Sequence, residues 1–226
     1  MTLAIFDLDN TLLNGDSDYL WGNYLVTQGM VDGEAYKKEN QRFFEDYQAG
    51  QLDIEEFQAF SLAPMVSMSP SQRNELHQSY MRDIIQPIIT EASRKLIAKH
   101  QQAGHTLMII TSTNHFITAP IAEELGIEHI LATDPEIVDD YFTGKIKGTP
   151  CYREGKVTRL HEWLKSTGNN LSDSWFYSDS HNDLPLLELV THPVAVDPDA
   201  TLSAHAIAKG WTILSLKEAK IKTLRA

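Results

Sequence analysis

Short, largely apolar segments alternate with segments of helical periodicity through most of this chain of 226 residues. The apolar segments lie at residues 3–6, 106–110, 127–131, 174–177, 193–196 and 211–214. Short apolar runs bounded by turn residues are typical of strands buried on both faces. Strands that alternate with helices over short links form parallel sheets covered by helices. We therefore predict an α/β fold with a doubly wound, Rossmann-like parallel sheet.

Residues 16–88 interrupt this alternation, because four helical patterns follow one another there without a strand pattern. Asp53 precedes the third pattern and Ser69 precedes the fourth, in positions typical of helix N-termini. We therefore predict an α/β core of residues 1–15 and 89–226 with an inserted all-helical cap of residues 16–88. Within the core, two runs around Thr143-Gly144 predict a small hairpin.

The composition excludes several classes of function. The formal net charge is −12 and Lys and Arg form no cluster, which argues against nucleic acid as a partner because a phosphate backbone requires clustered positive charge. No segment approaches the roughly 18 apolar residues of a membrane span, so we expect no membrane partner. The absence of a basic, apolar leader and the single cysteine, Cys151, predict a cytoplasmic protein with no internal disulfide. Cys151 has no His and Asn arrangement beside it, so we expect it to be structural.

The first apolar segment, Leu3–Phe6, ends in two carboxylates, Asp7 and Asp9. Doubly wound sheets bind ligands just beyond the carboxyl ends of their strands. One carboxylate in such a pair can be a nucleophile or metal ligand, and the other can be an acid or base. Their mutual repulsion favours a bound cation or a shared proton. An Asp-x-Asp sequence also occurs in ordinary capped turns, so other motifs must decide.

Polar residues follow two further strand patterns in the same way. Thr111 follows residues 106–110, and the backbone N–H groups after it begin a helix, an arrangement that suits an anion. Asp179 and Asp183 follow residues 174–177, and carboxylates at this spacing suit a hard divalent cation. In both places helix capping is the simpler alternative.

Lys156 lies near the start of a predicted helix. A cation there opposes the helix dipole, which indicates that the side chain serves another purpose. An exposed lysine is the alternative, and Lys145, Lys147 and Arg153 are nearby rivals for the same role.

Together these motifs resemble the haloacid dehalogenase (HAD) superfamily. The sequences Asp7-Leu8-Asp9-Asn10-Thr11, Thr111, Lys156 and Asp179-Ser180-His181-Asn182-Asp183 occur in the order of that family's four motifs. The resemblance spans the chain, and residues 16–88 resemble the type I cap of the phosphoserine phosphatase-like branch. Two departures are Ser178, where these phosphatases usually have glycine, and Thr111, where serine is commoner.

The resemblance implies a mechanism in which Asp7 attacks phosphorus to form an aspartyl-phosphate. Asp9 would protonate the leaving group and then activate water. Mg²⁺ would be held by the side chains of Asp7 and Asp179 and by the main-chain carbonyl of Asp9. Asp183 is implied as a supporting or additional metal carboxylate.

The resemblance also implies contacts with the substrate. Thr111 and Lys156 would hold the phosphoryl oxygens, with Ser112 beside them in the substrate-binding set. Asn182 is a further member of this set and is expected to orient Lys156 or Asp183.

Asp16 aligns with the carboxylate that holds the substrate ammonium in phosphoserine phosphatases, although it could equally cap the first helix of the insertion. The family arginine that binds a substrate carboxylate has no clear match in this sequence. Three arginines, Arg42, Arg73 and Arg82, lie in the insertion. This leaves both phosphoserine and the carboxylate-free histidinol phosphate as substrate types.

The sequence thus predicts a Mg²⁺-dependent phosphomonoesterase that acts on a small phosphate ester, as a monomer or homodimer. Two alternatives stay open at this point. A phosphotransferase on the same scaffold would pass the phosphoryl group to another hydroxyl. A non-enzymatic phospho-receiver shares a carboxylate, Thr and Lys site, but such domains are shorter and lack a helical insertion.

Overall fold

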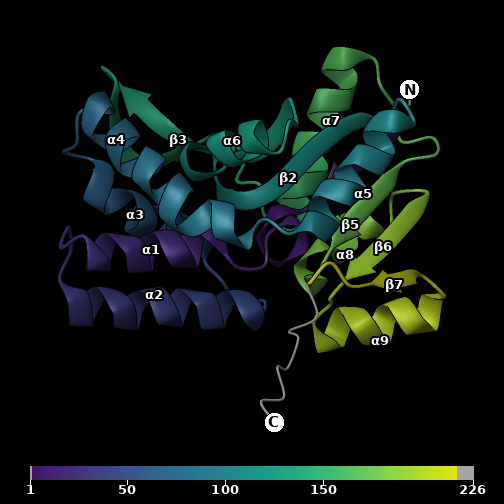
Figure 1. Cartoon of the computed structure of the whole chain (residues 1–226), viewed down its shortest axis with the longest axis horizontal. Coiled ribbons are helices and arrows are strands. Elements are labelled where there is room, and N and C mark those ends of the chain that lie inside the picture. Colours follow the sequence, from purple (N-terminus) through teal and green to yellow (C-terminus); the bar gives the residue numbers. More distant parts are fainter. Residues whose placement is uncertain (1, 218–226) are drawn as a thin grey trace, which may run out of the picture.

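A computed structural model describes residues 2–217 of the chain, and within them one sheet runs through the molecule (Figure 1). Its strand order is β4-β3-β2-β1-β5-β6-β7. Neighbouring strands are parallel except for the pair β3 and β4, which is antiparallel. The predicted doubly wound α/β fold is confirmed. The strands are β1 Leu3–Phe6, β2 Thr106–Asn114, β3 His129–Val138, β4 Tyr141–Lys147, β5 Trp175–Ser178, β6 His192–Val196 and β7 Thr212–Leu214.

Helices cover both faces of this sheet, as the continuous apolar strands require. Side chains alternate between the faces, so Ala4 and Phe6 enter one apolar cluster while Leu3 and Ile5 enter the other. The first cluster is completed by α5 (Glu91–Gln102) and α6 (His115–Glu124). The second is completed by α7 (Glu154–Thr167), α8 (Leu184–Leu187) and α9 (Ala200–Lys209).

Between β1 and α5 the chain forms helices and turns beside the sheet (Figure 1). The main helices are α1 (Ser17–Thr27), α2 (Gly33–Gln48), α3 (Ile54–Leu62) and α4 (Pro70–Tyr80). The predicted caps are present: Asp53 accepts hydrogen bonds from two N–H groups of α3, and Ser69 forms a reciprocal capping box with Gln72 at α4. We call residues 16–88 the helical segment.

The helical segment leaves and rejoins the rest of the chain at one point. Leu13 and Ile89 form an antiparallel bridge, and the N–H of Asn14 donates to the carbonyl of Ile88 at 2.8 Å. The two links between segment and sheet therefore lie side by side, which is the arrangement expected of an insertion into a continuous sheet.

The hairpin predicted around Thr143-Gly144 was placed wrongly. The turn lies at Asp139-Asp140, where both residues have positive φ (50° and 66°), and Val138 pairs with Tyr141 across it. Two consecutive left-handed residues make the two-residue turn whose twist matches the flanking strands. Thr143 and Gly144 lie inside β4.

The hairpin formed by β3 and β4 packs on the helical segment. Arg73 of α4 donates to the carbonyl of Asp140 at 2.7 Å, and its guanidinium lies 4.3 Å from the ring centre of Phe142.

Cys151, just after β4, is fully buried, and its thiol donates to the carbonyl of Leu131 at 3.4 Å. Within residues 2–217, none of the helices has the length and hydrophobicity of a membrane span.

Candidate active site

Asp7 occupies the carboxyl end of β1, the strand between β2 and β5. Its N–H donates to the carbonyl of Tyr177 at 2.8 Å, so it is tied to β5 as well. By alternation it shares the side of the sheet on which Leu3 and Ile5 pack against α7. Asp7 is 3% exposed, so it is buried where β1 ends.

Lys156 enters this site from the first turn of α7. Its Nζ lies 2.8 Å from Asp7 Oδ1 and 2.7 Å from Asp183 Oδ1, and its side chain is 1% exposed. Burial alone would lower the pKa of Lys156, but the carboxylates of Asp183 and Asp7 hold it above its ordinary value. The rivals Lys145 and Lys147 are exposed on β4.

The loop after β5 brings in the other two predicted carboxylates. The hydroxyl of Ser178 donates to Asp183 Oδ2 at 2.7 Å, so the residue that stands in place of the family's glycine supports this carboxylate. The hydroxyl of Thr11 donates to Asp179 Oδ1 at 3.1 Å and accepts from the N–H of Asp179 at 3.0 Å. The loop after β1 and the loop after β5 are thus joined directly.

Asp9 is held by two groups that the sequence patterns did not reveal. The N–H of Ser17 donates to its Oδ1 at 2.6 Å, and the hydroxyl of Thr113 donates to its Oδ2 at 2.8 Å. Asn10 takes a left-handed conformation (φ 56°), so the chain turns sharply after Asp9. Burial, together with the charge of Asp16, raises the pKa of Asp9 to about 7, and these hydrogen bonds oppose that rise.

Thr111 and Ser112 lie at the end of β2, next to β1. Phe6 of β1 pairs with Ile109 of β2. Thr111 and Ser112 come just after Ile109, so they lie at the same end of the sheet as Asp7, which follows Phe6. Thr111 is 1% exposed and its hydroxyl accepts from the N–H of Thr113 at 3.3 Å. Ser112 lines a cavity together with Asp7 and Asp9.

Two other predicted residues have contacts that refine their roles. Asp16 caps α1, because its Oδ1 accepts from the N–H of Tyr19 at 2.8 Å, and it also lines the cavity. Asn182 was expected to orient Lys156 or Asp183. Its amide instead donates to the carbonyl of Tyr47 at the end of α2.

The hydroxyl of Tyr152 donates to Asn182 Oδ1 at 3.2 Å, so both ends of this amide are occupied by groups other than those expected. Asn182 therefore fastens the helical segment to the loop that carries Asp179 and Asp183. The expectation was wrong because the sequence gives no indication that the end of α2 reaches this loop.

The arginines of the helical segment serve structural contacts. Arg42 pairs with Glu39, Asp46 and Glu56 on the outside of α2 and α3. Arg82 pairs with its exposed neighbour Asp83, and Arg73 holds the hairpin. None of the three lines the cavity.

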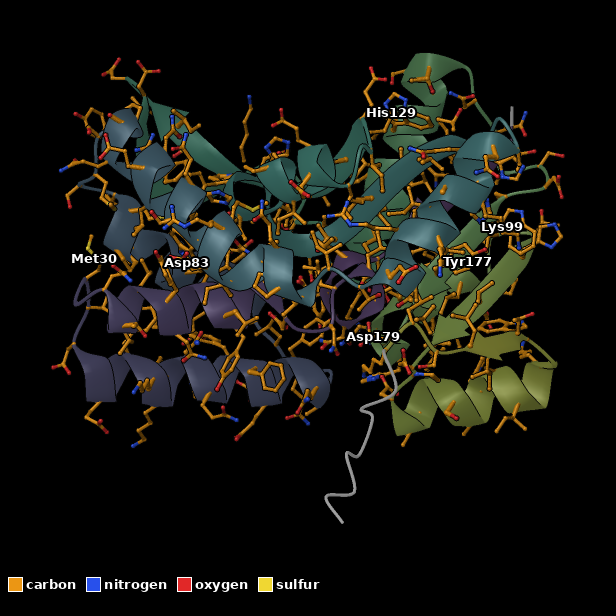
Figure 2. All side chains as sticks on the ribbon, in the orientation of Figure 1. Met30, Asp83, Lys99, His129, Tyr177 and Asp179 are labelled. Atoms are coloured by element: carbon orange, nitrogen blue, oxygen red, sulfur yellow. The ribbon has the colours of Figure 1, made fainter. Side chains whose placement is uncertain are left out.

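The site carries more negative than positive charge. Burial raises the pKa of Asp7 to about 7, an effect that Lys156 opposes and Asp183 reinforces. Burial, with Asp7 and Asp183, also raises the pKa of Asp179 well above its usual value. In Figure 2 Asp179 lies between the helical segment and α9. This charge balance suits a cation.

The donor set fits Mg²⁺, which takes oxygen ligands, uses one or two carboxylates and keeps several waters. Among the described residues, no group of three or more His, Cys, Asp or Glu side chains is already arranged to hold a metal ion. Asp7 and Asp179 each have one oxygen in a hydrogen bond, from Lys156 and Thr11 respectively. The second oxygen of each carboxylate makes no hydrogen bond to the described residues, so it is available as a ligand.

Comparisons with known proteins agree with this geometry. A histidinol-phosphatase of Neisseria meningitidis is 47% identical over 219 residues, which cover 95% of this chain and 99% of that protein. A crystal structure of a protein with unknown function from Bordetella pertussis has a TM-score of 0.90 at 43% identity, covering 96% of this chain and all of that one.

A substrate-bound phosphoserine phosphatase has a TM-score of 0.70 at 18% identity, covering 96% and 93% of the two chains, and shows the fold alone. The family described as haloacid dehalogenase-like hydrolase matches residues 4–188. The resemblance drawn from the motifs is therefore confirmed. This chain belongs to the haloacid dehalogenase-like hydrolase family.

Proposed function

We propose that this protein is a Mg²⁺-dependent phosphatase that hydrolyses a small phosphate monoester through an aspartyl-phosphate on Asp7. The observation that carries the proposal is that Asp7, which lines one cavity with Asp9, lies 2.8 Å from the ammonium of Lys156. A nucleophile, a fixed cation and a second carboxylate are the groups that a stepwise phosphoryl transfer requires. The family membership and the histidinol-phosphatase relative support it.

In the first step an oxygen of Asp7 attacks phosphorus, and the bond from phosphorus to the leaving oxygen breaks. Lys156 donates a hydrogen bond to Oδ1 of Asp7 and so fixes the orientation of the carboxylate that attacks. Asp9 gives its proton to the leaving oxygen, so that an alcohol departs rather than an alkoxide. The hydrogen bonds from Ser17 and Thr113 fix the direction in which Asp9 points.

In the second step Asp9 takes a proton from water, and the water oxygen attacks the phosphorus of the aspartyl-phosphate. The bond between phosphorus and Asp7 breaks, which releases phosphate and restores the free carboxylate. Lys156 and the Thr111 hydroxyl would bind the phosphoryl oxygens in both steps. A bound Mg²⁺ would neutralise the charge that develops on these oxygens.

We propose that the side chains of Asp7 and Asp179 and the main-chain carbonyl of Asp9 hold the Mg²⁺. Asp183 would support the site through Lys156, to which it lies 2.7 Å away. Ser112 lines the cavity and is proposed as a substrate contact. Asn182 would affect substrate binding indirectly, because it holds α2, which lines the cavity, against the loop after β5.

We also propose that residues 1–15 and 89–226 form the catalytic core and residues 16–88 its cap. The bridge from Leu13 to Ile89 supports this division, because the chain enters and leaves the helical segment there. The cap supplies much of the cavity wall, including Asp16 and several aromatic residues of α1, α2 and α3. We propose that the substrate bears an amine, with Asp16 as one carboxylate close to it.

The experiment is hydrolysis of p-nitrophenyl phosphate by the purified protein with Mg²⁺ or with EDTA. We expect phosphate release that requires Mg²⁺ and falls by roughly a thousandfold or more in Asp7→Asn. Asp173→Asn is the control, because Asp173 is an exposed carboxylate paired with His192 away from the cavity. An Asp7→Asn variant as active as the wild type, or equal activity in EDTA, would refute the proposal. Adding an alcohol acceptor separates transfer to the alcohol from hydrolysis.

A further inference from the structure

The helical segment supplies most of the lining of the cavity beside Asp7 and Asp9. Among the described residues, this part of the lining combines two carboxylates with an apolar, mainly aromatic wall, and none of the lining residues is Lys, Arg or His. The members are Asp16, Asp18, Tyr19, Asn40, Phe43, Phe44, Tyr47, Leu52, Ile54 and Phe57. A phosphate ester with its phosphorus at Asp7 would direct its other end toward these residues.

Asp18 is the residue of this lining with a buried polar atom that has no hydrogen-bond partner among the described residues. It is 5% exposed, and its Oδ1 accepts from the Ser61 hydroxyl at 2.8 Å. Its Oδ2 is buried and receives no hydrogen bond from the described residues. A buried carboxylate oxygen without a donor is costly, so such a group usually binds a water, ion or ligand, or has another function. Burial and the charge of Asp9 raise the pKa of Asp18, with Ser61 opposing, to about 7.

Asp16 also has one oxygen in a hydrogen bond, the one that caps α1, but this residue is only partly buried. The buried carboxylate oxygen of the cavity lining that receives no hydrogen bond from the described residues is therefore Asp18 Oδ2. Aromatic rings that contact one another line the same cavity: Tyr19 and Phe44 have ring centres 4.9 Å apart, and those of Phe43 and Phe57 are 5.3 Å apart. Aromatic faces attract cations.

Arg42, the basic residue next to Phe43 in the sequence, does not line the cavity. Arg42 lies with its guanidinium 4.0 Å from the ring centre of Phe43, and its charge is taken up by Glu39, Asp46 and Glu56. A substrate carboxylate in the cavity would meet carboxylates and aromatic faces without a cation to pair with. Selection against a ligand that bears a carboxylate follows from its repulsion by these carboxylates as much as from attraction of the preferred ligand.

We propose that Asp18 Oδ2 accepts a hydrogen bond from a cationic N–H group at the end of the substrate remote from the phosphate, and that the cavity selects phosphate esters lacking a carboxylate. The proposal rests on the proposed phosphatase function and narrows its substrate class to amine-bearing or imidazole-bearing alcohol phosphates. Asp18 is then a residue that determines specificity, separate from the phosphoryl-transfer groups.

The first test compares kcat and KM for three esters: histidinol phosphate, phosphoserine and p-nitrophenyl phosphate. We expect the wild type to favour histidinol phosphate over phosphoserine. Asp18→Asn should raise KM for histidinol phosphate by about 10- to 100-fold relative to p-nitrophenyl phosphate, because a hydrogen bond between charged groups is lost. The control is Asp46→Asn, which removes a carboxylate on the outside of α2 and should leave these ratios unchanged.

A binding measurement without turnover separates failure of this proposal from failure of the phosphatase function. Calorimetric titration of the wild type with histidinol and with histidine compares ligands that differ by a carboxylate. Tighter binding of histidinol, weakened in Asp18→Asn, supports the proposal even if no ester is hydrolysed. Equal binding of the two ligands overturns it, and that comparison needs no variant to fold. Hydrolysis of p-nitrophenyl phosphate with no preference among the charged esters overturns it while the phosphatase function stands.

Discussion

The site depends most on one residue, Lys156, whose buried ammonium lies between two carboxylates. Its distances to Asp7 and Asp183 are 2.8 and 2.7 Å, and all three side chains are at most 5% exposed. Desolvation of the three charges is offset only while they stay together. The same ion cluster therefore serves the fold and positions Asp7, so stability and activity are coupled through Lys156.

We predict that Lys156→Met lowers the free energy of unfolding by about 3 to 5 kcal/mol, because it leaves two buried carboxylates without their cation. Adding Asp183→Asn to this variant should recover part of the loss. Urea denaturation without Mg²⁺ measures both effects. Lys209→Met is the control, since Lys209 is half-exposed and its pair with Glu188 lies on the surface. If Lys156→Met changes stability no more than Lys209→Met, the cluster does not stabilise the fold.

The residues of the site that sequence patterns can reveal are those whose type is unusual for their place. Asp7 and Asp9 follow an apolar strand, and Lys156 opposes a helix dipole, so each stands out. Ser17 could not be found in this way, because it binds Asp9 through a backbone N–H that almost any residue would supply. Thr113 resembles the other hydroxyl residues after β2, and only the path of that strand brings it to Asp9.

Among the elements, the parallel strands were predictable because each is an apolar run between helices. The hairpin was harder, since glycine is the stronger turn signal and Gly144 drew the prediction away from Asp139-Asp140. Gly144 does have positive φ (83°), but it lies within β4 and not in the turn between the two strands. Asp139 and Asp140 adopt the left-handed region without glycine, which short polar side chains tolerate.

The start of α7 is the element boundary that places Lys156. A Cβ at Gly155 would lie 2.0 Å from the carbonyl oxygen of Pro150, so the helix can begin this close to the preceding loop only with glycine there. Arg153, just before the helix, has φ 50° and ψ −120°, which shows how sharply the chain turns into it. The backbone contact fixes the direction from which the lysine enters.

We predict that Gly155→Ala shifts the start of α7 and lowers stability by roughly 1 to 3 kcal/mol, as overpacking of a close contact does. The kcat for p-nitrophenyl phosphate should fall as well, because Lys156 moves with its helix. Gly33→Ala, at the start of α2, is the matched control: its Cβ would meet only Val26, at 3.4 Å. Denaturation and kinetics on both variants test this. Wild-type behaviour of Gly155→Ala would show that the loop yields without cost.

At the scale of the whole molecule, the site joins segments that are far apart in the chain. The hydroxyl of Thr11 reaches Asp179 across 168 residues, and Lys156 is 149 residues from Asp7. The helical segment is fastened to the same place through Asn182 and Tyr47. A cation bound by Asp7 and Asp179 would therefore tie the first strand to the fifth, and it would bind the folded chain far better than the unfolded one.

We therefore predict that Mg²⁺ raises the thermal unfolding midpoint. A ligand at about 100 times its dissociation constant stabilises the folded state by about 2.7 kcal/mol, which corresponds to roughly 5 to 10 °C for a chain of this size. The rise should be much smaller in Asp179→Asn, which removes one charged ligand, and undiminished in the exposed-carboxylate variant Asp173→Asn. A midpoint that does not respond to Mg²⁺ would contradict the metal site. An equal rise in both variants would place the ion elsewhere, because only Asp179 lies where the loops after β1 and β5 meet.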